Sequence, residues 1–180
     1  MVACFTEGAS PIHKATVVPR GNSLGMVSWQ PDNDDQFYTR KQMLAMMDVC
    51  MGGLVAEELI YGEDGVTSGP SGDLKQVTDT ATWMVERWGM SERVGVVVHK
   101  NRTGDRAMPL ASEETRCAID EEIKDLTDKA YLNAKMILHE KEHLLHLLAK
   151  ELIEKETLTG VEVRAILGIK EKPKPPVSLV

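Results

Sequence analysis

Hydrophobic residues recur along most of the chain at spacings of three and four, which is the period of an amphipathic helix. This pattern predicts a long helix over about 39–61, ended by Gly62, and a second helix over about 73–89. It also predicts a long third helix that begins near Ser112 and bends near 139–142. A fourth, short helix is expected to begin at Thr159. Most of the chain is therefore expected to be helical.

Two runs rich in β-branched residues break the helical pattern near the start of the chain. They cover 14–20 and 24–30, and Gly-Asn-Ser between them favours a β-hairpin. A third such run, 94–99, predicts a short strand, and 100–110 reads as a surface loop. We expect a mainly α fold with a small hairpin or edge-strand element.

The domain organisation follows from length and composition. We expect one domain over residues 1–168, because 180 residues suit a single core, and a disordered, proline-containing tail over 169–180. No run of about 18 apolar residues suggests a membrane span. No targeting peptide is recognised at the start, where residues 1–5 look like the end of a helix that has lost its beginning.

The charge and composition exclude some functions. A net charge of −7 and an aromatic content of 4% disfavour a nucleic-acid partner, which requires a basic face or stacking platform. The three cysteines, Cys4, Cys50 and Cys117, are far apart and odd in number. They indicate buried thiols in a reducing compartment rather than a disulfide framework.

One zinc motif occurs literally, as His-Glu-Lys-Glu-His over 139–143. Histidines at positions i and i+4 of a helix can share a zinc ion while the glutamate activates water. Here, however, His139 and His143 fall on the face opposite to the apolar stripe of their helix. We therefore interpret this motif as an exposed, charged helix face and not as the active site.

The segment 52–74 is the more informative candidate, because it carries three carboxylates among apolar residues at the turn between two helices. They are Glu57, Glu58 and Asp73. A carboxylate in apolar surroundings needs a proton, a cation or a metal. Structural alternatives exist: Asp73 can cap the second helix together with Gln76, and Glu57 can form a buried salt bridge to an arginine.

The same segment carries a family resemblance. Residues 51–62 read Met-Gly-Gly-Leu-Val-Ala-Glu-Glu-Leu-Ile-Tyr-Gly, and residues 66–74 read Val-Thr-Ser-Gly-Pro-Ser-Gly-Asp-Leu. These stretches resemble the proteolytic domain of FtsH-type ATP-dependent zinc metalloproteases, most closely the mitochondrial i-AAA and related organellar members. Further similar stretches follow the family's order along nearly the whole chain: 13–21, 24–27, 84–92 and 156–158.

The resemblance implies a site. In the family, two histidines of an HExxH helix and one aspartate hold the zinc, and that aspartate corresponds to Asp73. Glu57 is expected to orient a ligand histidine from the second shell. Leu24, Gly25, Met26 and Val27 resemble the cleft-edge strand that pairs with extended substrate backbone. The family's HExxH should come just before Val2, so we expect both zinc histidines and the catalytic glutamate to be absent from this chain.

The resemblance also implies a cellular location, an assembly and a class of substrates. We expect a membrane-anchored, hexameric protease of a mitochondrion or chloroplast that degrades unfolded or membrane proteins. An upstream AAA module would bind ATP, since this chain has no GxxxxGK[ST] motif. The chain departs from the family pattern at Leu54, Pro70 and Gly72, where arginine, alanine and serine or asparagine are usual. A proteolytically silent ring subunit is therefore the alternative, and an unrelated acidic binding module is a third reading.

Overall fold

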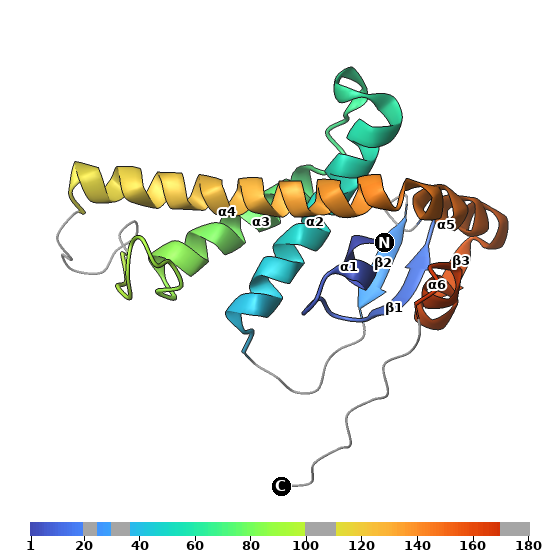
Figure 1. Ribbon diagram of the computed structural model, residues 1–180, viewed down its shortest axis with the longest axis horizontal. Coiled ribbons are helices and arrows are strands. Elements are labelled where there is room, and N and C mark those ends of the chain that lie inside the picture. The colour runs from blue at the N-terminus through green and yellow to red at the C-terminus, as the bar shows by residue number, and fades with distance from the viewer. Residues whose placement is uncertain (20–24, 30–36, 100–110, 170–180) are drawn as a thin grey trace, which may run out of the picture. The chain divides into compact units, whose positions relative to one another are not determined.

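The computed structural model describes residues 1–19, 25–29, 37–99 and 111–169, and these residues form two compact units. The first unit consists of residues 1–9 and 33–140, and the second of residues 10–32 and 141–180. Helices dominate, with one small antiparallel sheet (Figure 1). The prediction of a mainly α fold with a small hairpin is confirmed.

The first unit is helical. Its elements are α1 (Val2–Phe5), α2 (Arg40–Tyr61), the 3-10 turn η1 (Glu63–Gly65), α3 (Ser71–Glu86) and α4 (Glu113–Glu140). α2, α3 and α4 pack against one another, and α1 packs against α2 and α4. Figure 1 shows the long α4 crossing α2 and α3.

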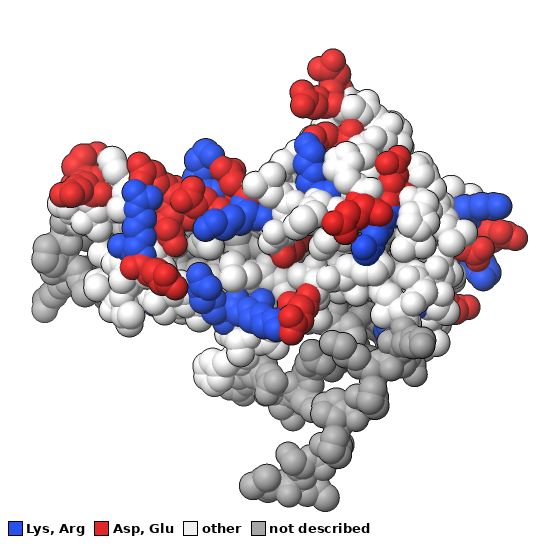
Figure 2. Space-filling model, viewed as in Figure 1, with Lys and Arg blue, Asp and Glu red and all other residues white. Residues whose placement is uncertain are grey.

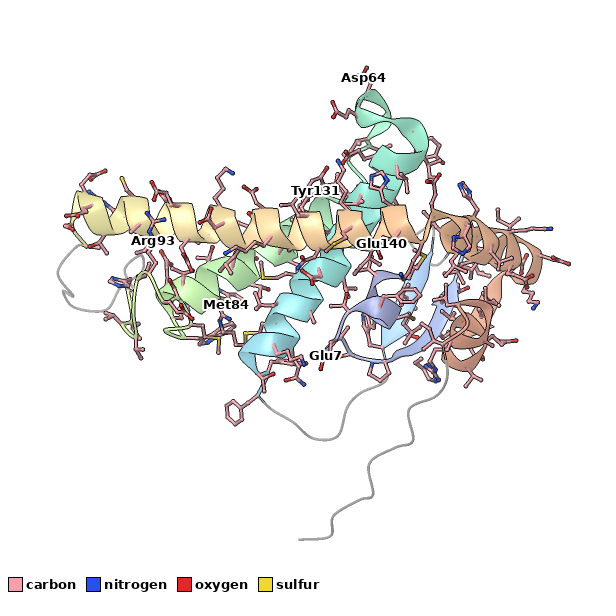
Figure 3. The ribbon with its side chains drawn as sticks, viewed as in Figure 1. Glu7, Asp64, Met84, Arg93, Tyr131 and Glu140 are labelled. Atoms are coloured by element: carbon pink, nitrogen blue, oxygen red, sulfur yellow. The ribbon has the colours of Figure 1, made fainter. Side chains whose placement is uncertain are left out.

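The ends of α2 agree with the sequence prediction. Thr39 and Gln42 form a capping box at its start, in which each side chain accepts a hydrogen bond from the other residue's backbone amide. Gly62 ends the helix with φ of +76°, a conformation that an L side chain rarely adopts. The turn η1 follows, with Asp64 at its tip, pointing away from the helices (Figure 3).

The core of the first unit consists of aliphatic and methionine side chains from α2, α3 and α4. The largest fully buried side chains in this unit are Met47, Val55, Val77, Met84, Val85 and Leu138. The buried stripe of α2 passes through Met43, Met47, Met51 and Val55. On a neighbouring face of α2, Cys50, Leu54 and Glu57 are half-buried and Tyr61 is exposed.

The second unit contains the sheet, with β1 (Ile12–Thr16), β2 (Met26–Trp29) and β3 (Thr157–Thr159), and the helices α5 (Glu142–Lys155) and α6 (Gly160–Ile166). The strand order is β2-β1-β3, and both pairs are antiparallel. The predicted hairpin is confirmed by the β1–β2 pair. β3, which sequence reasoning missed, occupies the other side of β1.

Some predicted elements differ in the structure. The run 94–99 is not a strand, although Ser91 and Gly95 form an isolated antiparallel bridge. Its valines, Val96, Val97 and Val98, are exposed, so they lack the sheet that would bury them. Leu24, the loop 100–110 and the tail beyond 169 lie outside the described residues. Among the described residues, no helix is long and apolar enough to span a membrane.

Candidate active site

Asp73 lies in the first turn of α3. The helix begins at Ser71, and Pro70 occupies the N-cap position without a side-chain hydrogen bond. The interpretation of Asp73 as a cap paired with Gln76 is therefore wrong: the cap position lies three residues earlier, and Gln76 donates to the sulfur of Met46 at 3.5 Å. The side chain of Asp73 therefore does not cap α3.

Two consecutive glycines on α2 let other parts of the first unit approach closely. A Cβ at Gly52 would lie 3.0 Å from Cγ2 of Val2 in α1, and a Cβ at Gly53 would lie 3.7 Å from Oδ2 of Asp73. The close approach at Gly52 is to a side chain of α1, and the distance at Gly53 is an ordinary van der Waals contact. α1 thus contacts α2 at Gly52, and the carboxylate of Asp73 contacts α2 at the next residue, Gly53.

Asp73 is an exposed residue whose carboxylate is open to a ligand. Within the described part of the chain, its carboxylate accepts no hydrogen bond and forms no ion pair, and burial raises its pKa above the usual value. The thiol of Cys50, one turn before Gly53 on α2, interacts electrostatically with this carboxylate. Burial, together with the negative charge of Asp73, raises the pKa of the Cys50 thiol to about 11. The described residues therefore give this anion no compensating cation, and solvent reaches it.

Glu57 secures the loop between α2 and α3. Its Oε2 accepts a hydrogen bond from the backbone amide of Thr67 at 2.7 Å. The Thr67 hydroxyl in turn accepts from the amide of Gly69 at 3.1 Å, and a Cβ at Gly69 would lie 3.4 Å from Oε1 of Glu57. Among the described residues the partner of Glu57 is this backbone amide, and no described arginine forms the salt bridge that the alternative expected.

Glu58, the third carboxylate, faces α4. It forms an ion pair with Lys135 at 2.7 Å and accepts a hydrogen bond from the hydroxyl of Tyr131. These two contacts lower the pKa of Glu58. Figure 3 labels Tyr131 on α4 where it crosses α2. Glu58 is therefore fully compensated and fixes α2 to α4, which leaves Asp73 as the uncompensated acid of the segment.

The literal zinc motif over 139–143 lies on two helices. α4 ends at Glu140 and α5 begins at Glu142, so the break predicted near 139–142 is confirmed. Both His139 and His143 are exposed, as the helix pattern indicates. The interruption at Lys141 removes the continuous helix that an i, i+4 zinc pair requires.

The predicted substrate-binding strand is an edge strand of the sheet in the second unit. Gly25, Met26 and Val27 are described, and Met26 and Val27 belong to β2, whose one partner strand among the described residues is β1. A Cβ at Gly25 would lie 2.8 Å from the carbonyl oxygen of Thr16, so glycine permits this close approach. The side chains of Met26 and Val27 are exposed. The free edge can accept an added strand.

The residues fit a catalytic zinc only in part. Asp73 offers an unpaired oxygen donor, but the described residues contain no group of three His, Cys, Asp or Glu side chains that could hold a metal ion. A catalytic zinc needs about three protein ligands. On the face shown in Figure 2, acidic and basic side chains are interspersed.

Comparisons with known proteins find similarity along nearly the whole chain. Residues 1–166 match peptidase family M41. The chain is 46% identical over 172 residues to the ATP-dependent zinc metalloprotease FTSH 11, chloroplastic/mitochondrial, of Arabidopsis thaliana, covering 96% of this chain and 20% of that protein. It is 46% identical over 169 residues to the ATP-dependent zinc metalloprotease YME1L1 of Homo sapiens, covering 93% and 21% respectively. The chain thus spans about a fifth of the length of these curated relatives.

Proposed function

The chain belongs to peptidase family M41, and from this premise we propose that it is the proteolytic part of an ATP-dependent zinc metalloendopeptidase. The observation that carries the proposal is Asp73, a carboxylate held against Gly53 without a hydrogen bond or cation among the described residues. An anionic oxygen donor left unpaired at the junction of two helices is suited to a metal ion.

In this proposal Asp73 supplies one oxygen ligand to the zinc, and the histidines of an HExxH helix outside residues 1–180 supply the others. Together these residues would hold the zinc, which would supply a Lewis acid to activate water and polarise the scissile carbonyl. Glu57 holds the loop between α2 and α3 in place through the Thr67 amide, and orients a ligand histidine. The free edge of β2 pairs with the backbone of an extended substrate.

The proposed setting takes ATP dependence and the organelle from the relatives' names, and the substrates, ring and membrane anchor from the family resemblance. Unfolded or membrane proteins are the substrates, an AAA module in the same protein supplies ATP-driven force, and six copies form the ring. A membrane segment outside residues 1–180 anchors the assembly in a mitochondrion or chloroplast. Residues 1–168 act as the peptidase domain, and residues 1–180 alone are inactive, because one aspartate cannot hold a catalytic zinc.

A proteolytically silent subunit that helps to build the ring is the second candidate. Two observations favour it: the described residues do not complete a metal site, and Pro70 and Gly72 beside Asp73 depart from the family pattern. Pro70 is buried at the N-cap position of α3. This candidate predicts a stable assembly that does not cleave protein.

The test is to measure zinc content and ATP-dependent casein cleavage in the full-length protein. The peptidase proposal predicts about one zinc per chain and cleavage that stops in Asp73→Asn, with zinc lost as well. The matched control is His139→Ala/His143→Ala, which should retain zinc and cleavage. An intact assembly that neither binds zinc nor cleaves casein supports the silent subunit. Zinc lost only from the histidine double variant would refute Asp73 as a ligand.

A further inference from the structure

The end of α2 extends beyond the hydrophobic core of the first unit. Val55 is 1% exposed, and none of the residues that follow it in α2 is buried. Ile60 and Tyr61 are exposed, and this end of the helix projects past α4 toward the turn labelled at Asp64 (Figure 3). Helix ends fray where few apolar contacts hold them. Polar contacts must therefore keep the last turns of α2 folded.

Two residues of α4 make polar contacts with Glu58 near this end of α2. Nζ of Lys135 donates hydrogen bonds to Oε1 of Glu58 at 2.7 Å and to the hydroxyl oxygen of Tyr131 at 3.1 Å. The Tyr131 hydroxyl in turn donates to Oε2 of Glu58. Both carboxylate oxygens are thus bonded, by side chains one helical turn apart on the same face of α4. Because the Glu58 side chain is only 18% exposed, water competes weakly with these charge-assisted hydrogen bonds.

Glu57 and Glu58 are neighbours in the same turn of α2 but contact different elements. Successive side chains of a helix point about 100° apart, so Glu58 can reach α4 while Glu57 reaches the loop after the helix. There, Oε2 of Glu57 accepts a hydrogen bond from the backbone amide of Thr67 at 2.7 Å. Unwinding the last turns of α2 would move Glu57 away from this amide. Whatever keeps the end of α2 folded therefore also keeps Glu57 in contact with Thr67.

The loop carries this restraint to Asp73 through a short series of hydrogen bonds. The Thr67 hydroxyl accepts from the backbone amide of Gly69 at 3.1 Å. The carbonyl of Ser68 accepts from the amide of Ser71 at 3.1 Å. Ser71 is the first residue of α3, and Asp73 lies in the same first turn. The position of Thr67 thus fixes the start of α3 and, with it, the place from which the Asp73 carboxylate extends.

We propose that Lys135 and Tyr131 are positioning residues, which hold the metal-binding carboxylate of Asp73 in place through Glu58 and the loop between α2 and α3. Neither side chain contacts zinc or substrate in this proposal. Its consequence for zinc rests on the proposed peptidase function, because the role of Asp73 as a ligand belongs to that function. The coupling between α4 and the loop does not, since every contact in it lies within the described residues.

The first experiment measures hydrogen exchange of the Thr67 amide by NMR in the 180-residue chain. Removing an interaction quickens exchange at the amides whose opening breaks that interaction. Lys135→Met, which removes both hydrogen bonds of the ammonium group, should therefore quicken exchange at Thr67 by roughly fivefold or more. Tyr131→Phe removes a single hydroxyl and should also quicken exchange there. Unchanged exchange at Thr67 in Lys135→Met, or in Tyr131→Phe where the lysine variant does not fold, overturns the proposal.

Two controls separate this coupling from a general loss of stability. Lys124→Met removes an exposed ion pair with Asp128 on the same helix, so it should leave exchange at Thr67 unchanged. The amide of Glu162 donates to a capping hydroxyl in the second unit, and its local opening does not involve α4. It should therefore exchange at an unchanged rate in Lys135→Met. Equal quickening at Glu162 and Thr67, or quickening at Thr67 in Lys124→Met, would show a general effect and refute the coupling.

The second experiment measures the zinc affinity of the full-length protein against a competing chelator. Residues that support metal ligands typically contribute about 10–100-fold, so Lys135→Met should weaken zinc binding by roughly tenfold. Lys124→Met should not, and Lys135→Arg, which keeps a cation beside Glu58, should retain most of the affinity. Equal affinity in Lys135→Met and the unaltered protein overturns the positioning of Asp73. A protein that binds no zinc, but in which Lys135→Met still quickens exchange at Thr67, would refute the peptidase function while the coupling of α4 to the loop stands.

Discussion

Replacing Asp48 with asparagine should stabilise the protein at neutral pH and leave its stability nearly unchanged near pH 4. Asp48 lies on α2 and is only 8% exposed. Its two carboxylate oxygens accept hydrogen bonds from Nδ2 of Asn133 on α4, at 3.2 and 3.3 Å, and no described residue forms an ion pair with it. Burial raises the pKa of Asp48 from 3.8 to about 6, and the Asn133 hydrogen bond only partly opposes this shift.

The sign of the effect follows from proton binding. Between pH 4 and 6 the folded protein binds more protons at Asp48 than the unfolded chain does, so the free energy of unfolding falls as pH rises. The difference of about 2 pKa units, at 1.36 kcal/mol each, gives a loss of about 3 kcal/mol that is complete above pH 6. Asparagine does not titrate and keeps a hydrogen-bonding partner for Asn133. The gain should therefore grow from near zero at pH 4 to about 3 kcal/mol at pH 7.

Urea denaturation followed by circular dichroism at pH 4, 5, 6, 7 and 8 measures this gain. Taking the difference between Asp48→Asn and the unaltered protein cancels the titration of every other group. Asp125→Asn removes an exposed acid from α4 and should show no comparable pH-dependent gain. A loss of stability at pH 8, or a gain equal at pH 4 and pH 8, would show that Asp48 is not an uncompensated buried charge.

Three further changes test local features. Gly160→Ala should lower the free energy of unfolding by about 3 kcal/mol or more, because its Cβ would lie 1.8 Å from a backbone carbonyl oxygen of β1. The control Gly72→Ala, whose Cβ would lie in open space, should not lower it, and thermal denaturation measures both. Thr39→Ala removes the capping box of α2 and should cost about 0.5–2 kcal/mol in urea denaturation; no change would refute the cap. Glu57→Ala leaves the Thr67 amide without its acceptor, so hydrogen exchange there should quicken roughly tenfold, and unchanged exchange would contradict the contact.

Sequence periodicity predicts best those helices whose ends are marked by capping or helix-ending residues in the sequence. Thr39 and Gln42 encode the start of α2 within four residues, and Gly62 encodes its end, so both boundaries are local. The break between α4 and α5 is likewise visible in the pattern. The run 94–99 misled the prediction because β propensity needs a partner strand, and the described structure gives only one isolated bridge there.

The acidic residues of the first unit also show that some features can be read from local sequence and others only from the packed structure. Asp48 was missed because it follows Met47 on a helix that is apolar nearly all round, and only the position of α4 decides that its carboxylate is buried beside Asn133. The signal in the sequence was that Asp48 directly follows Met47, a large apolar residue of the same helix, which is consistent with a buried acid. For Asp73, the resemblance indicated a ligand while the residue pattern favoured a cap, and the structure excludes the cap.

The glycine pair on α2 brings two parts of the first unit against one short stretch, and the two positions differ in how much space they leave. A Cβ at Gly52 would lie 3.0 Å from Cγ2 of Val2, so this glycine lets α1 pack closely on α2. A Cβ at Gly53 would lie 3.7 Å from Oδ2 of Asp73, which is an ordinary van der Waals contact. The packing of α1 therefore depends on glycine at position 52, whereas the place of the Asp73 carboxylate is set by α3 and not by the absence of a side chain at position 53.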